Sequence, residues 1–145
     1  MDFFTAMEVS ATGLNAERTR LNVASSNLAN AQTTKGPDGK PYARQDVVLR
    51  SQAAAMNISG AQAGESATAV TGVQVAGIKA DATPPRMEYD PGHPDANADG
   101  YVAYPNVNPV EEMVDMITAS RAYQAGVTAL DSATQLAEKA IGIGK

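Results

Sequence analysis

The chain has 145 residues, of which 43% are hydrophobic and 5% aromatic, and it contains no Trp and no Cys. This length allows one ordinary domain, or one small domain on an extended helical frame. The 11 basic and 16 acidic residues give a net charge of -5, which is unfavourable for holding a nucleic acid by its phosphates. The absence of cysteine excludes disulfides, thiolate nucleophiles and Cys-ligated zinc.

The amino-terminal end lacks the positively charged region and the continuous apolar stretch of a secretory signal peptide. No window approaches the roughly 18 apolar residues that a membrane-spanning helix requires. These rules predict a soluble, cytoplasmic chain. That expectation would change only if the chain used an export route that requires neither a signal peptide nor a membrane-spanning helix.

Residues 2–30 are predicted to form the first helix, because they contain no Pro, one Gly and apolar side chains at helical spacing. One column of this helix repeats every seven residues, as in a coiled coil. Arg18 and Ser25 interrupt the second column. The predicted seam of this helix consists of Met7, Leu14, Leu21 and Leu28.

The middle of the chain, residues 33–108, is predicted to be rich in short strands, because it holds every Pro except Pro109 and most of the Gly. A turn over residues 36–39 precedes a predicted strand at 42–50. Further short strands are predicted at 72–79, 87–89 and 101–104. Residues 51–71 are mostly Ala, Ser, Gly and Gln, so we expect a flexible loop, or a segment that becomes ordered only against a partner.

Residues 109–141 are predicted to form the second helix, whose start is clearly marked. Asn108 can cap it, Pro109 suits the first helical position, and Glu111 and Glu112 place negative charge at the positive end of the helix dipole. Gly142 and Gly144 are the predicted stop. The predicted seam residues of this helix, at alternating steps of three and four, include Met113, Met116, Tyr123, Val127, Leu130 and Ile141.

These elements predict an α+β fold, in which two long terminal helices pack as a coiled-coil-like inner domain and carry a small β-rich middle segment. The expected division is 1–32 and 109–145 for the helical domain, and 33–108 for the middle segment with its loop at 51–71. The helices would be about 40 and 50 Å long, too long for the middle segment to cover. Either they bury their own seam as a hairpin, or they also pack on helices of other subunits.

The sequence offers little apparatus for catalysis. His93 is the only histidine and lies in a Gly-His-Pro turn, so no His-based metal set and no triad with a second histidine can be assembled. Neighbouring Glu111 and Glu112 point about 100° apart on a helix and do not share a site. Glycine-rich phosphate-binding motifs are absent. We therefore expect no enzymatic activity and no cofactor.

The segment from Asp95 to Gly100 matches the opening of a calcium-binding EF-hand loop. The twelfth position of that loop requires a bidentate Glu, and here it is Asn106. Nearby prolines also forbid the flanking helices. We expect instead an Asx-rich turn that leads into the strand at 101–104.

Three separated motifs give the chain a family resemblance. The run from Ser26 to Thr33, SNLANAQT, resembles the S-x-N-[IL]-A-N-x-x-T signature of the flagellar axial proteins, which include rod and hook subunits. The run from Pro109 to Ala125 is similar to the carboxy-terminal end of that family. The runs at 89–96 and 100–108 resemble its proximal rod members. The residues that carry the first and third motifs are Asn27, Ala29, Asn30, Thr33, His93, Pro94, Gly100, Tyr101, Pro105 and Asn106.

The resemblance implies a structural subunit that is exported unfolded through the flagellar type III apparatus, without a cleavable signal peptide. It implies helical self-assembly across the periplasm, with the terminal helices around the export channel and the β-segment outside. The implied partners are further copies, other proximal rod proteins of the FlgB and FlgF types, and the FliE-type adaptor that joins the rod to the membrane ring. Such a rod transmits torque to the hook.

Two other classes remain open at this stage. A helical-hairpin adaptor, or a needle-type subunit of a related type III secretion apparatus, would share the long amphipathic ends, but it leaves the motifs at 89–96 and 100–108 unexplained. An enzyme that accompanies the rod, such as a peptidoglycan hydrolase, would need a carboxylate pair in a cleft or a metal set.

Overall fold

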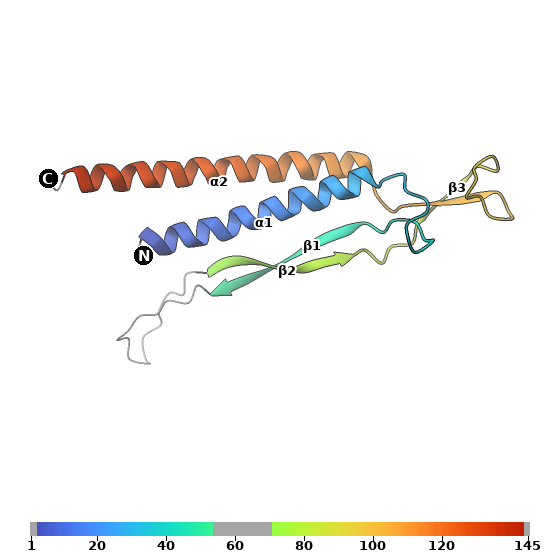
Figure 1. Cartoon of the computed structure of the whole chain (residues 1–145), viewed down its shortest axis with the longest axis horizontal. Coiled ribbons are helices and arrows are strands. Elements are labelled where there is room, and N and C mark those ends of the chain that lie inside the picture. Colours follow the sequence, from blue (N-terminus) through green and yellow to red (C-terminus); the bar gives the residue numbers. More distant parts are fainter. Residues whose placement is uncertain (1–2, 54–70, 144–145) are drawn as a thin grey trace.

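The computed structural model describes residues 3–53 and 71–143 and has six elements (Figure 1). Two long helices, α1 (Phe3–Ala29) and α2 (Pro109–Ile143), flank a strand-rich middle segment. Strands β1 (Gln45–Ala53) and β2 (Thr71–Ala80) form one antiparallel pair, and β3 (Arg86–Tyr89) and β4 (Tyr101–Tyr104) form another. This architecture confirms the predicted α+β class.

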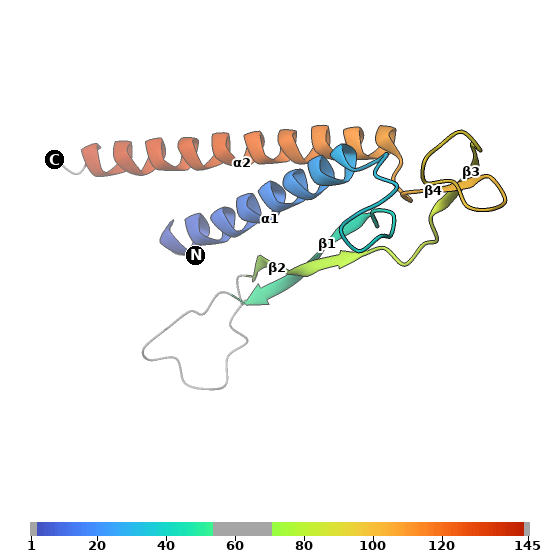
Figure 2. The same ribbon diagram turned by 45° about the vertical axis from the view of Figure 1, so that its right-hand side comes forward.

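The elements form three layers, with α1 in the middle. Helix α1 contacts α2 on one side and both strands of the β1–β2 hairpin on the other. The two views agree on this order, and they place the β3–β4 pair beyond the end where α2 begins (Figure 2). In the described residues, no Cα atom of α2 lies within 8 Å of one in β1 or β2. Neither helix is long and apolar enough to cross a membrane.

The start of α2 is as predicted. The Asn108 side-chain oxygen accepts a hydrogen bond from the Val110 N–H at 3.1 Å, and Pro109 occupies the first helical position. The predicted stop is wrong at Gly142, because the helix continues through it to Ile143. Glycine lowers helix stability by only about 1 kcal/mol, so it ends a helix only where the backbone turns left-handed. Gly144 lies outside the described residues.

The first hairpin lies further along the chain than predicted. Strand β1 begins at Gln45 rather than residue 42, and residues 51–53 pair with residues 71–73 of β2. These positions were expected in a flexible loop, but backbone pairing in an antiparallel ladder does not require large side chains. Residues 54–70, the rest of that expected loop, lie outside the described residues. The predicted turn at 36–39 is confirmed, since the Gly39 N–H donates to the Gly36 carbonyl at 3.0 Å.

The chain has a small core and an extended surface. Among the residues that the structure describes, the buried apolar side chains are few and mostly small, and the chain exposes 10332 Å². A compact monomer of 15.0 kDa would expose roughly 7,000 Å². The buried apolar residues are Ala16, Val23, Ala24, Ala31, Val102, Val107 and Ala119.

The contact stripe of α2 coincides only in part with the predicted seam. Glu112 and Ala119 are buried, each 1% exposed, although neither was predicted to face the partner helix, whereas the predicted Met113 is exposed. Gly126 lies seven residues, or about two helical turns, after Ala119, and a Cβ added there would stand 2.7 Å from Leu14 Cδ2. Among the predicted seam residues, Met113, Tyr123 and Ile141 are exposed, while Met7, Leu14, Leu21, Leu28, Met116, Val127 and Leu130 are partly buried.

Candidate assembly interface

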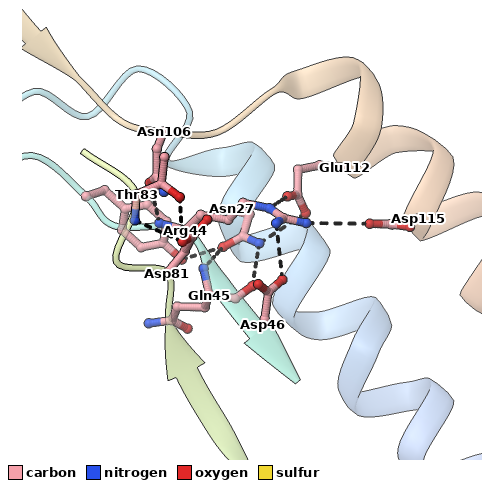
Figure 3. Close-up of polar contacts among 10 residues, drawn as sticks. Asn27, Arg44, Gln45, Asp46, Asp81, Thr83, Asn106, Glu112 and Asp115 are labelled. Atoms are coloured by element: carbon pink, nitrogen blue, oxygen red, sulfur yellow. Dashed lines mark hydrogen bonds and ion pairs between the residues drawn. The ribbon is translucent and has the colours of Figure 1, made fainter. Parts of the chain in front are cut away.

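A buried polar cluster joins three separate parts of the chain, and Asn27 of α1 lies at its centre (Figure 3). The Asn27 side chain is 1% exposed. Its Nδ2 donates to the Gln45 carbonyl at 2.9 Å and to Glu112 Oε2 at 3.0 Å. Its Oδ1 accepts from Tyr42 Oη and from the Gln45 N–H, both at 2.9 Å. All four hydrogen-bonding positions of the amide are therefore used, which offsets the cost of burying it.

The same cluster contains an ion pair between Arg44, which is partly exposed, and the buried Glu112. Arg44 Nε donates to Glu112 Oε1 at 2.6 Å, and the Glu112 side chain is only 2% exposed. The guanidinium also lies 3.3 Å from Asp46 and 3.9 Å from Asp115. The hydrogen bond to Glu112, together with the three carboxylates, raises the pKa of Arg44 above its ordinary value despite partial desolvation. The pair thus ties the segment entering β1 to the first turn of α2.

Asn27 was identified from the sequence, but the roles of Arg44, Tyr42 and Glu112 were not. Glu112 was explained only by its place at the positive end of α2. A signal was available, because Glu112 falls four residues before Met116 and seven before Ala119, so a charged residue interrupts a stripe of apolar and small side chains. A charge on a buried stripe requires a partner. The sequence does not indicate which basic residue supplies it.

The loop before β4 is an Asx-rich turn, as predicted. Asn97 Oδ1 accepts from the N–H groups of Asp99 and Tyr101, at 3.0 and 2.9 Å. Gly100 has a positive φ of 79°, which glycine adopts most easily. Asp95 Oδ2 accepts from Thr34 Oγ1 at 2.7 Å. Within residues 3–53 and 71–143, no group of three or more His, Cys, Asp or Glu side chains could hold a metal ion.

The remaining motif residues support the ends of the elements. Asn30 follows α1, donates to the Ser26 carbonyl at 2.9 Å and accepts from Thr33 Oγ1 at 3.3 Å. Asn106 Oδ1 accepts from the Arg44 N–H at 2.9 Å. Ala29 is the last residue of α1, and Pro105 is fully buried. The Tyr101 ring packs edge-on against the Tyr89 ring, with 5.3 Å between the ring centroids. His93 and Pro94 lie in the turn that precedes the Asx loop, where His93 Nδ1 accepts from the Asp95 N–H.

Exposed apolar side chains lie on both outer layers of the molecule. On α2 four of them lie in the first three turns and others follow at Tyr123, Leu136 and Ile141, and on the β1–β2 hairpin they occur on both strands. Large apolar groups left in solvent in this way mark surfaces that other molecules cover. Those of the first three turns of α2 are Val110, Met113, Val114 and Ile117, and those of the hairpin are Val48, Leu49, Val73 and Ile78.

Comparisons with known proteins agree with this architecture at both ends of the chain. Residues 7–37 match the family model "Flagella basal body rod protein", and residues 98–143 match "Flagellar basal body rod FlgEFG protein C-terminal". The first region contains most of α1 and Asn27, and the second contains β4, Glu112 and α2.

Similarity to curated proteins extends over the whole chain. The flagellar basal-body rod protein FlgC of Bacillus subtilis is 42% identical over 150 aligned positions, covering 100% of both chains. The FlgC protein of Borreliella burgdorferi is 41% identical, with 99% of this chain and 98% of the relative covered. That of Salmonella typhimurium is 38% identical with complete coverage of both. The chain therefore belongs to the FlgC family of flagellar basal-body rod proteins.

Proposed function

We propose that this chain is a structural subunit of the flagellar basal-body rod and has no enzymatic activity. It would assemble helically in the periplasm, form part of the drive shaft around the export channel, and transmit torque to the hook. The observation that carries this proposal is the full-length identity of 34–42% to FlgC rod proteins. The extended shape and the exposed apolar faces support this proposal, because neighbouring subunits in a polymer would cover the apolar surface that a single chain leaves in water.

We assign the terminal segments 1–32 and 109–145 to the inner helical domain and 33–108 to its outer β-rich segment. Along the helix pair, the partly buried seam residues would be covered further by helices of other subunits. A groove between the helices, lined mainly by small side chains, supports this role because small side chains let another helix approach closely. Its lining consists of Ser10, Gly13, Leu14, Glu17, Ala122, Gly126 and Ala129.

The outer face of α2 changes character after its first three turns, which supports a place beside the export channel. From Arg121 onward the exposed positions on this side include Gln124, Thr128 and Asp131. These side chains suit a water-filled passage, whereas Val110, Met113 and Ile117 suit a protein contact.

The proposed partners are other copies of this chain, proximal rod proteins of the FlgB and FlgF types, and the FliE-type adaptor at the membrane ring. Export would proceed through the flagellar type III apparatus without a cleavable signal peptide. No cofactor or small-molecule substrate is needed, since the side chains of the buried cluster around Asn27 bond to one another and to the backbone and serve to join elements.

The test is deletion of the gene for this chain, followed by motility assays and electron microscopy of purified basal bodies. We expect non-motile cells whose basal bodies keep the membrane ring and lack the rod, with recovery when the chain is supplied from a plasmid. A complete rod in the deletion strain would refute the proposal.

A further inference from the structure

A stripe of apolar side chains runs along the first turns of α2 on the side that faces away from α1. In both views α1 and the β1–β2 hairpin lie on the same side of α2 (Figures 1 and 2). Ile117 and the buried Ala119 are two residues apart, which at about 100° per residue places them on nearly opposite sides of the helix. A single copy therefore leaves the stripe in solvent. It consists of Val110, Met113, Val114 and Ile117, which are 44–63% exposed.

The stripe has an unpaired charge at each end. Positions 110, 114, 117 and 121 alternate steps of four and three residues, which is the spacing of a coiled-coil seam. Arg121 thus ends the stripe, and Glu111 flanks its beginning. Both side chains are exposed, and neither forms an ion pair with any other residue that the structure describes. The helix dipole favours a carboxylate at Glu111 but leaves it in solvent.

This charge pattern decides the direction in which two such stripes can pack. In an antiparallel pair, Val114 of each copy lies against Ile117 of the other. The outer layers then join Val110 to Arg121, whose side chain can run along the apolar seam to Glu111 of the other copy. In a parallel, in-register pair Glu111 would meet Glu111 and Arg121 would meet Arg121, and like charges across an interface are costly. The stripe is therefore complementary to itself in the antiparallel direction.

We propose that two free copies of the chain pair through this stripe as an antiparallel dimer, with α2 packed on α2 around a two-fold axis. The contact is isologous, so it closes at two copies and cannot by itself build a rod. It spans only about three helical turns, and interfaces of this size are weak and reversible. The inference goes beyond the proposed function, because it describes the chain before assembly. Each copy covers the apolar stripe of the other until neighbours in the rod replace it.

The test is sedimentation equilibrium of the purified full-length chain over a range of concentrations. We expect the average mass to rise from 15.0 kDa toward twice that value and not beyond it. Arg121→Glu should weaken the dimer at least about tenfold, because a carboxylate then faces Glu111 at both ends of the contact. Ile117→Asp should abolish the dimer, because it places a charge in the apolar seam. Circular dichroism checks that each variant keeps the helix content of the natural chain.

The double variant Glu111→Arg/Arg121→Glu exchanges the two charges and should restore the dimer. In a parallel pair this exchange would leave like charges facing each other, so restoration also establishes the antiparallel direction. The matched control is Lys139→Glu, which makes the same change of charge at an exposed position of α2 outside the stripe. We expect it to dimerise like the natural chain.

Four results would each overturn the inference: a natural chain that stays at 15.0 kDa, multiples larger than a dimer, an Arg121→Glu variant that dimerises normally, or a charge exchange that fails to restore the dimer. Motility separates this inference from the proposed function. A chain that stays monomeric in solution and still restores motility to the deletion strain removes the dimer and leaves the proposed function standing.

Discussion

Asn27 Nδ2 and Glu112 Oε2 are 85 residues apart in the sequence and 3.0 Å apart in the structure. Both side chains are fully buried, so this hydrogen bond crosses the interface between α1 and α2 out of reach of water. A hydrogen bond to a charged, buried acceptor is stronger than an ordinary one, and costly to break on one side only.

Replacement of Asn27 by Ala should destabilise the chain by about 3 kcal/mol or more, because it leaves the Gln45 backbone groups and the Tyr42 hydroxyl without their partner. Urea unfolding followed by circular dichroism measures the change. Asn22→Ala, at an exposed position of the same helix, is the control and should change stability by less than about 0.5 kcal/mol. Equal effects of the two substitutions would contradict the central role of Asn27.

Replacement of Arg44 should cost about 3–5 kcal/mol, because Glu112 then stays buried without a counter-charge. Replacement of Glu112 should cost less, because Arg44 is 25% exposed and keeps Asp46 and Asp115 nearby. Arg44→Met and Glu112→Gln, alone and combined, form a double-mutant cycle that isolates the interaction energy. We expect the double variant to be less destabilised than the sum of the single variants. Strict additivity would show that the two groups do not interact.

Gly126 and Gly13 should respond in opposite directions to replacement. At Gly13 an added Cβ has no neighbour within 4 Å, so Gly13→Ala should raise stability by up to about 1 kcal/mol through helix propensity. At Gly126 the new group meets Leu14 Cδ2, so Gly126→Val should lower the melting temperature. Adding Leu14→Ala to Gly126→Val should cost less than Leu14→Ala costs alone. Thermal unfolding of the four variants decides this.

Asp81 provides a local prediction for pH. Hydrogen bonds from the Thr83 N–H and hydroxyl, at 2.9 and 2.8 Å, hold the pKa of Asp81 below its ordinary value. A carboxyl pKa lowered by folding contributes stability above the unfolded-state pKa, and that contribution is lost as pH falls through the folded-state pKa. Thr83→Val removes only the hydroxyl bond, so NMR titration should show the pKa of Asp81 rising toward its ordinary value. An unchanged titration would exclude the hydroxyl as a cause.

Leu21→Asp tests the seam of α1 in the assembled rod. Leu21 is only partly buried within the chain, so the structure leaves room for a neighbour to cover it. A charge placed there would be buried without a partner in every copy of the polymer. We expect loss of motility while the protein is still made and exported, detected by immunoblot. Cells that carry Arg18→Ala, a substitution on the exposed side of α1, should swim normally.

The two helices could be predicted because their apolar spacing, the Asn108 cap and Pro109 are local signals. The contact register could not, because Ala119 and Gly126 are too small to mark a periodic stripe in the sequence. Asn27 was identified through its family motif. The pairing of Arg44 with Glu112 was not identified, because the two residues are 68 positions apart in the sequence. No periodic pattern encodes such a pairing, since it depends on where the hairpin crosses α1.

The central position of α1 also has a consequence for folding. It is made first, yet both of its covering layers come later in the chain, and α2 begins only at Pro109. Most of the stability of a helix in a protein comes from tertiary packing of one face, so α1 depends on the layers that cover it. Docking of the β1–β2 hairpin first, through the Val73 N–H bond to Thr12 Oγ1 at 3.1 Å, shortens the loop that must close before α2 can dock. The chain should therefore fold from the middle layer outward, with α2 as the final and slowest step.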